Sequence, residues 1–205
     1  AQVALADVVL RTPVLENPDV NEMLGGRLLL KAENIQRTGA FKIRGAYYRI
    51  LNLTSKERAC GTVSYSSGNH ALGLARAAQL LGSSAVIVMP SDVTTAKMNA
   101  TRALGAEIVT FDRDTENSAD VVARIRSQTG SIEVPPSAHG QVLAGAGTAA
   151  LELFEDAPVL DAVLVPCGGG GLTAATAVVM AETSPRTQFY AAEPALFDDT
   201  RRSLV

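Results

Sequence analysis

The amino-acid sequence predicts an α/β fold, because short apolar runs alternate with longer alanine-rich segments from residue 62 onward. This alternation is typical of parallel strands that are joined by helices. Two of the helical segments are followed by glycines, Gly82 and Gly105, at positions where helices commonly end. Of the 205 residues, 47% are hydrophobic, which is enough to form a core.

The hydrophobic period gives the expected elements in order. Strands are predicted at residues 62–65, 85–89, 107–111, 161–166 and 188–192. Helices are predicted at residues 70–81, 95–104, 118–129, 142–154 and 173–182. Before residue 60 we expect a strand at 28–32, a polar turn at 36–39 and a helix at 41–53. Pro135-Pro136 predicts a loop that crosses between two halves of the molecule.

Charge and cysteine content narrow the class of protein. The net charge is −3, and no block of like charges occurs, which argues against a nucleic-acid or anionic membrane surface. No apolar run approaches the roughly 20 residues that cross a bilayer. Cys60 and Cys167 lie far apart without a CxxC spacing, which favours a reduced cytoplasm. Small molecules are therefore the expected partners.

The first motif is TGAFKIRGA at residues 38–46, which places Lys42 at the start of a predicted helix. The partial positive charge of a helix N-terminus disfavours the ammonium form, so the free amine is more available to attack an aldehyde. The alternative is an ordinary solvated surface lysine, and the motif alone does not decide between the two.

The second motif, SSGNH at residues 66–70, lies between a predicted strand and a predicted helix. Open α/β sheets bind ligands at this end of their strands, and backbone N–H groups there can hold a carboxylate. The third motif is the run Gly168–Gly171, again between a strand and a helix. Glycines let the backbone wrap closely around an anion such as a phosphate. A simple capped turn and a glycine hinge are the respective alternatives.

Taken in order, KxExxQxTGxFKxRGA, SSGNH and GGGGL resemble the β-family of pyridoxal-phosphate enzymes, specifically serine/threonine dehydratases and serine racemases. The resemblance extends over nearly the whole chain. It implies the tryptophan-synthase-β fold (fold type II), with two open, twisted, mainly parallel sheets flanked by helices. It also implies a large cofactor-binding domain at residues 1–60 and 139–205, and a small mobile domain at residues 61–138.

The resemblance further implies the role of each site residue. Lys42 would form the Schiff base with pyridoxal phosphate and act as general base, Phe41 would pack beside the cofactor ring, and Asn69 would bond the ring oxygen. Ser67 would be the acid/base on the opposite face of the ring. Two further groups share a role each. The cofactor phosphate would be held by Gly168, Gly169, Gly170, Gly171 and Leu172. The substrate carboxylate would be received by Ser66, Ser67, Gly68, Asn69 and His70.

A divalent cation is a further implication of the resemblance. Glu193, the Phe197 carbonyl and Asp199 match positions that bind Mg²⁺ or Ca²⁺ in racemases and related dehydratases. An ordinary acidic turn is the alternative. The family also continues beyond the position of Val205, so we expect the C-terminal part of the large domain to be missing from this sequence.

The expected activity is the dehydration and deamination of L-threonine, L-serine or a related β-hydroxy amino acid to a 2-oxo acid and ammonia. Serine racemase is an alternative, although Ser118 stands where the racemase has an arginine. A β-replacement enzyme or a threonine synthase on the same fold is another. The non-enzymatic alternative is an inactive amino-acid-binding relative. Relatives are commonly homodimers, so a homodimer is expected.

Overall fold

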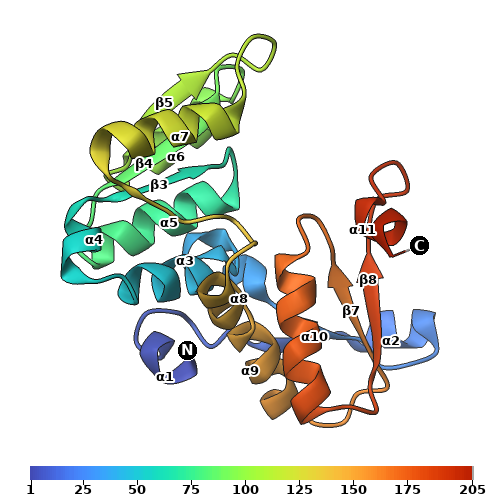
Figure 1. Cartoon of the computed structure of the whole chain (residues 1–205). Helices are drawn as coiled ribbons and strands as arrows, with labels where there is room; N and C mark the ends of the chain where they lie inside the picture. The colour runs from blue at the N-terminus through green and yellow to red at the C-terminus, as the bar shows by residue number, and fades with distance from the viewer. Residues whose placement is uncertain (205) are drawn as a thin grey trace.

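The computed structural model describes residues 1–204 and has the expected α/β architecture (Figure 1). Its strands are β1 (Val14–Glu16), β2 (Leu29–Lys31), β3 (Thr62–Tyr65), β4 (Ala85–Pro90), β5 (Glu107–Phe111), β6 (Ile132–Glu133), β7 (Ala162–Pro166) and β8 (Gln188–Ala192). Its α-helices are α1 (Gln2–Leu5), α2 (Pro18–Leu24), α3 (Lys42–Leu51), α4 (Ser55–Ala59), α5 (Asn69–Leu80), α6 (Thr95–Arg102), α7 (Ser118–Thr129), α8 (Gly140–Ala146), α9 (Thr148–Asp156), α10 (Gly171–Thr183) and α11 (Asp199–Ser203). Two short 3₁₀ turns, η1 (Glu33–Ile35) and η2 (Arg37–Gly39), precede α3. None of the helices described is long and apolar enough to span a membrane.

The largest sheet has the strand order β5-β4-β3-β6, and all of its strand pairs are parallel. Its strand β4 is almost continuously apolar because helices cover both faces of the sheet. One face packs against α5, while Val63 and Val88 on the other face pack against α7. Gly82 and Gly105 follow α5 and α6 in the left-handed region, as the sequence predicts.

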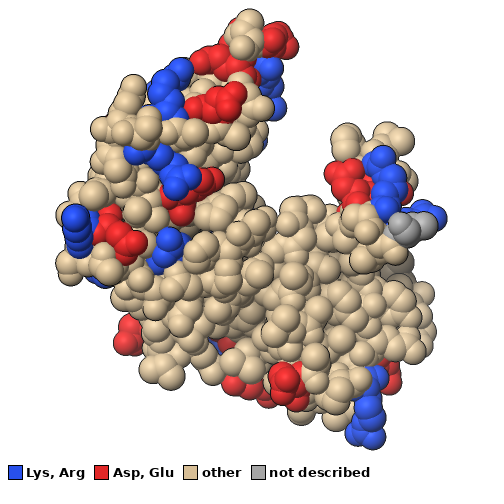
Figure 2. Space-filling view, in the orientation of Figure 1, with Lys and Arg blue, Asp and Glu red and all other residues tan. Residues whose placement is uncertain are grey.

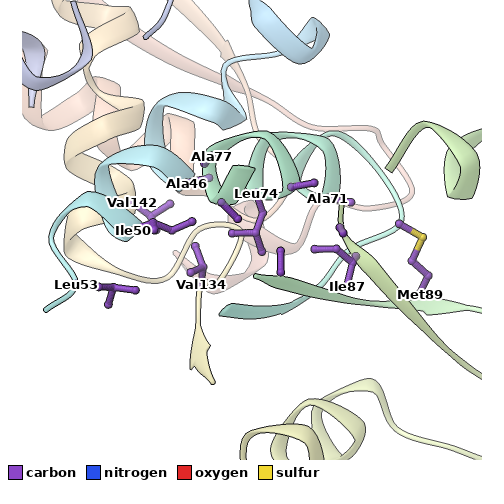
Figure 3. Close-up of a cluster of buried hydrophobic side chains, with 14 residues drawn as sticks. Ala46, Ile50, Leu53, Ala71, Leu74, Ala77, Ile87, Met89, Val134 and Val142 are labelled. Atoms are coloured by element: carbon purple, nitrogen blue, oxygen red, sulfur yellow. The ribbon is translucent and has the colours of Figure 1, made fainter. Parts of the chain in front are cut away.

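The core on the α5 side joins α3 to this sheet. Ile50 of α3, Leu74 of α5 and Ile87 of β4 have no exposed surface, and Figure 3 shows their side chains between the helices and the sheet. Small side chains dominate the helix faces, with alanines at positions 46, 71, 75, 77 and 78. Because alanine side chains are small, α3 and α5 lie close together, and this close packing holds α3 in position.

A second parallel pair, β7 and β8, packs against α9 and α10. Val163 and Val165 point inward against Phe154, whereas Leu164 and Tyr190 are exposed. The β1–β2 pair is antiparallel. The prediction of mainly parallel sheets is thus confirmed for the two sheets that flank the site, and the division into domains at residues 60/61 and 138/139 stays a prediction.

The single helix predicted at residues 142–154 is wrong. The chain forms α8 and α9, which are separated at Gly147. A side chain at Gly147 would meet Val179 of α10 at 3.3 Å, and the hydroxyl of Thr148 donates to the Gly145 carbonyl at 2.7 Å. The close approach of α10 and this local hydrogen bond divide a segment whose apolar period alone looks continuous.

A buried ion network lies beneath α3. The Arg44 side chain is fully buried and forms two hydrogen bonds to each of two carboxylates, Glu33 at 2.7 and 2.9 Å and Glu152 at 2.6 and 2.9 Å. Lys31 adds a second cation to Glu152 at 2.8 Å and also lies 3.7 Å from Asp156. Both buried cations therefore have carboxylate partners, as buried charges require. The network ties α3 to the N-terminal segment and to α9.

Candidate active site

Lys42 is the first residue of α3, directly after the turn that η2 forms. Its Nζ donates a hydrogen bond to the carbonyl oxygen of Pro136 at 2.6 Å and lies 5.0 Å from the centre of the Phe41 ring. Burial lowers the pKa of Lys42 below its ordinary value, because desolvation disfavours the ammonium form. The amine is therefore easier to deprotonate than that of a fully solvated lysine, and the role of Lys42 as the Schiff-base lysine stays a prediction.

Three glycines fix the position of α3. A side-chain carbon on Gly73 of α5 would meet the backbone nitrogen of Ile43 at 2.9 Å and the backbone carbon of Lys42 at 3.0 Å. On the other side, a side-chain carbon on Gly145 of α8 would meet the Arg44 carbonyl oxygen at 2.3 Å and Gly45 at 2.7 Å. The lysine-bearing helix is thus held between α5 and α8, backbone against backbone.

The four-glycine run lies at the end of β7 and leads into α10, beside the Pro136 segment (Figure 1). Gly170 has a φ of 73°, in the left-handed region that favours glycine. A side-chain carbon on Gly171 would meet Ser137 at 2.8 Å, whereas Gly168 and Gly170 have open space around them. Lys42, Phe41, Ser137 and Gly171 line one cavity, so the fold brings the first and third motifs together.

The residues present fit pyridoxal phosphate. The glycine run offers backbone N–H groups and the N-terminus of the thirteen-residue α10 to a phosphate. Close by in the first turn of α10, the hydroxyl of Thr173 is buried and has no hydrogen-bond partner in the described part of the chain, while the Leu172 side chain packs against the core of α9 and β7. The cavity that Lys42, Ser137 and Gly171 line is about 10 Å³, roughly the space of one water molecule.

The second motif spans the end of β3 and the first turn of α5. Asn69 is the first residue of α5 and is exposed, and Ser66 and Ser67 are partly exposed. The first N–H groups of a helix have no carbonyl of their own helix to bond, so those of Asn69 and His70 can hold an anion. The His70 ring points the other way: it is 3% exposed and its Nε2 lies 2.8 Å from the Val134 carbonyl oxygen.

The three residues expected to bind a cation lie around α11. The Glu193 carboxylate accepts hydrogen bonds from the backbone N–H groups of Thr200 and Arg201, and the first of these bonds is the main cause of its lowered pKa. Asp199 pairs with Arg202 at 3.0 Å. Within residues 1–204, no three His, Cys, Asp or Glu side chains gather as a metal cluster. The cation site of Glu193, the Phe197 carbonyl and Asp199 stays a prediction.

Figure 2 shows a hollow between the lobe that carries the four-stranded sheet and α11, and the floor of this hollow is almost free of charged side chains. An anionic ligand in this region would therefore be held by backbone N–H groups and helix dipoles. This agrees with the expected small-molecule partner.

Sequence reasoning missed three groups next to the predicted residues. They are the Pro136 carbonyl, the Ser137 side chain over the glycine run, and the Thr173 hydroxyl. The only sequence signal for the first two was the Pro135-Pro136 pair, which indicates a loop and says nothing about chemistry.

Comparisons with known proteins agree with this site. Residues 5–204 match the family "Pyridoxal-phosphate dependent enzyme". L-threo-3-hydroxyaspartate ammonia-lyase from Pseudomonas sp is 43% identical over 94% of this chain and 60% of its own length. L-threonine ammonia-lyase from Thermotoga maritima is 42% identical over 92% of this chain and 47% of its own length. The structure of maize serine racemase superposes with a TM-score of 0.95 at 37% identity, over 98% of this chain and 61% of that one.

This chain therefore spans about half to 60% of the length of these relatives. The family match covers almost every residue and includes the lysine, the SSGNH loop and the glycine run. By fold, site chemistry and relatedness, the chain belongs to the pyridoxal-phosphate dependent enzymes, whose cofactor its site fits.

Proposed function

We propose that this chain carries the lysine, the phosphate cradle and the substrate loop of an ammonia-lyase. Its substrate would be L-threonine, L-serine or a related β-hydroxy amino acid, and its products a 2-oxo acid and ammonia. The observation that carries the proposal is the half-buried Lys42, whose pKa is lowered and whose cavity is shared with the glycine run. The names of two relatives support it, because both are ammonia-lyases.

Bound pyridoxal phosphate supplies an electron sink for the substrate carbon that carries the amino group. Lys42 would hold the cofactor aldehyde through Nζ and take up the substrate α-proton at the same atom. Phe41 would pack beside the cofactor ring and Asn69 would donate to its oxygen. Gly168 to Gly171 and the backbone of Leu172 would hold the phosphate.

The substrate carboxylate would be oriented by the segment from Ser66 to His70, in which the open N–H groups of Asn69 and His70 are the donors. Because the His70 ring is turned toward Val134, its part would come from the backbone. We retain Glu193, the Phe197 carbonyl and Asp199 as proposed ligands of Mg²⁺ or Ca²⁺.

The second candidate is racemisation of serine, which the maize structure favours by its close superposition. Ser67 would then supply a proton from the ring face opposite Lys42. The two activities differ in their products: 2-oxo acid and ammonia indicate elimination, and D-serine indicates racemisation. A panel of L-threonine, L-serine and L-threo-3-hydroxyaspartate separates these from a β-replacement enzyme, from a threonine synthase and from an inactive amino-acid-binding relative.

The test of the proposed function is Lys42→Ala. We expect this variant to lose both turnover and the visible absorbance that added pyridoxal phosphate gives, whereas Lys56→Ala, at an exposed position, retains both. Borohydride reduction and peptide mapping should place the label on Lys42 in the unaltered chain. Full ammonia release by Lys42→Ala would refute the assignment.

The proposal also covers the oligomeric state and the cellular location. A homodimer is expected from the resemblance and would be tested by sedimentation. A cytoplasmic location is supported by Cys60 and Cys167, which form no disulfide.

A further inference from the structure

The His70 ring is held in one tautomer. Its Nε2 lies 2.8 Å from the Val134 carbonyl oxygen, and a carbonyl can only accept, so Nε2 carries the proton. Its Nδ1 is buried and has no hydrogen-bond partner among residues 1–204. Burial lowers the pKa of His70 to about 4, so the ring is neutral near pH 7 and cannot attract an anionic substrate by charge.

Val134 is fixed from two sides. Its N–H donates to the Val63 carbonyl of the central sheet at 3.0 Å, and its own carbonyl accepts from His70. The next two residues are Pro135 and Pro136, whose rings fix φ and restrict the residue before each of them. A short, stiff connection therefore runs from the His70 bond to the Pro136 carbonyl.

The Pro136 carbonyl is the group that receives the Lys42 amine, at 2.6 Å. The same helix, α5, also contacts Lys42 from behind, since a side-chain carbon on Gly73 would meet the Lys42 backbone at 3.0 Å. His70 and Gly73 are three residues apart and lie on one face of α5. That face of α5 therefore contacts the Lys42 backbone directly at Gly73. It is connected to the Lys42 amine indirectly, from His70 through Val134 and the two prolines.

We propose that His70 is a positioning residue: through Val134 and the Pro135-Pro136 pair, it sets the place of the carbonyl that orients the Lys42 amine. Any effect of His70 on turnover rests on the proposed function, but its effect on the position of the Lys42 amine does not. In this proposal the two prolines couple the position of Val134 to that of the Pro136 carbonyl, because a flexible linker in their place would let the two residues move independently.

The test compares three replacements of His70. Glutamine can place an amide N–H near the position of the ring Nε2, so His70→Gln should keep the bond to Val134. Asparagine is equally polar but too short, so His70→Asn should lose this bond, as should His70→Leu. Each variant is labelled with acetic anhydride over a range of pH, without added cofactor, and the labelling of Lys42 is measured by mass spectrometry against exposed Lys56 and Lys97.

Loss of the Pro136 acceptor removes a partner of the ammonium form, so the half-labelling pH of Lys42 should fall. We expect a fall of about 0.4 to 1 pH unit in His70→Asn and His70→Leu, equal to the roughly 2- to 10-fold effect of one hydrogen bond. His70→Gln should stay within about 0.3 unit of the unaltered chain. The charge around Lys42 does not change, because the His70 ring is already neutral and Arg44 is paired with Glu33 and Glu152. Among the described residues that line the cavity, Lys42 is the one with an ionisable side chain.

The direction in which the half-labelling pH of Lys42 changes distinguishes loss of the Pro136 acceptor from a general loosening of the structure. Loosened packing would expose Lys42 and raise its half-labelling pH toward the ordinary lysine value. A rise or no change in His70→Asn and His70→Leu would overturn the inference, and so would an equal fall in His70→Gln. Should the His70 variants fail to fold, Pro135→Gly loosens the connection with His70 intact and should give the same fall. Because no cofactor or substrate is used, failure of the proposed lyase activity would leave this result standing.

Discussion

Replacing Gly145 by alanine should push α3 and α8 apart directly beneath Lys42. The added carbon would lie 2.3 Å from the Arg44 carbonyl oxygen and 2.7 Å from Gly45. Both obstructing atoms belong to the backbone, so no side chain can rotate away, and the helices must separate by about 1 Å to reach ordinary contact. We expect a loss of about 3 kcal/mol in the free energy of unfolding, the upper part of the range for overpacked cores.

The matched control is Gly140→Ala in the same helix. No atom lies within 4 Å of a side-chain carbon at Gly140, and its backbone is outside the left-handed region. This change should be neutral or stabilising by up to about 1 kcal/mol. Thermal unfolding followed by circular dichroism should show a Tm lowered by about 6–12 °C for Gly145→Ala only. Equal Tm values for the two variants would refute the claim that backbone contact holds α3 in place.

Two further predictions concern buried charge. The pKa of His70 in the folded chain, about 4, lies below its ordinary value of 6.5, so the unfolded chain binds a proton first as the pH falls. The contribution of His70 to the free energy of unfolding should therefore drop by about 3 kcal/mol between pH 6.5 and pH 4. Urea titrations of His70→Gln should lack this drop. Glu152→Gln should lower the free energy of unfolding by about 3 kcal/mol, because it leaves the Arg44 network with excess positive charge. Glu155→Gln on the same helix removes an exposed ion pair and should lower it by less than about 1 kcal/mol. Equal urea midpoints for the two glutamine variants would contradict the network's charge balance.

The fold after residue 60 was predictable because its strands and helices are long enough for their period to show. β3, β5 and β8 have the predicted bounds, and α7 spans the predicted residues 118–129. Before residue 60 the strands are only three residues long, and α1, β1, α2 and α4 were missed; after residue 60 the two-residue β6 and the short α11 were missed as well. Elements this short have no measurable period, and their position is decided by tertiary contacts such as the pairing of β1 with β2.

The candidate site divides in the same way. Lys42 and the glycine run were predictable because chemistry and spacing are visible in consecutive residues. The Pro136 carbonyl was not, since every residue has a carbonyl and only the folded chain shows which one faces an amine. The orientation of the His70 ring was missed for a related reason: its acceptor, Val134, lies 64 positions away and is a backbone atom.

The Arg44 network also bears on the order in which the chain folds during synthesis. Arg44 follows Lys42 by two residues, yet its carboxylate partner Glu152 is made 108 positions later. Until Glu152 leaves the ribosome, burying the guanidinium would leave one of its two carboxylate contacts empty, which is costly. We therefore expect the lysine-bearing helix to reach its final position only after α9 has been synthesised.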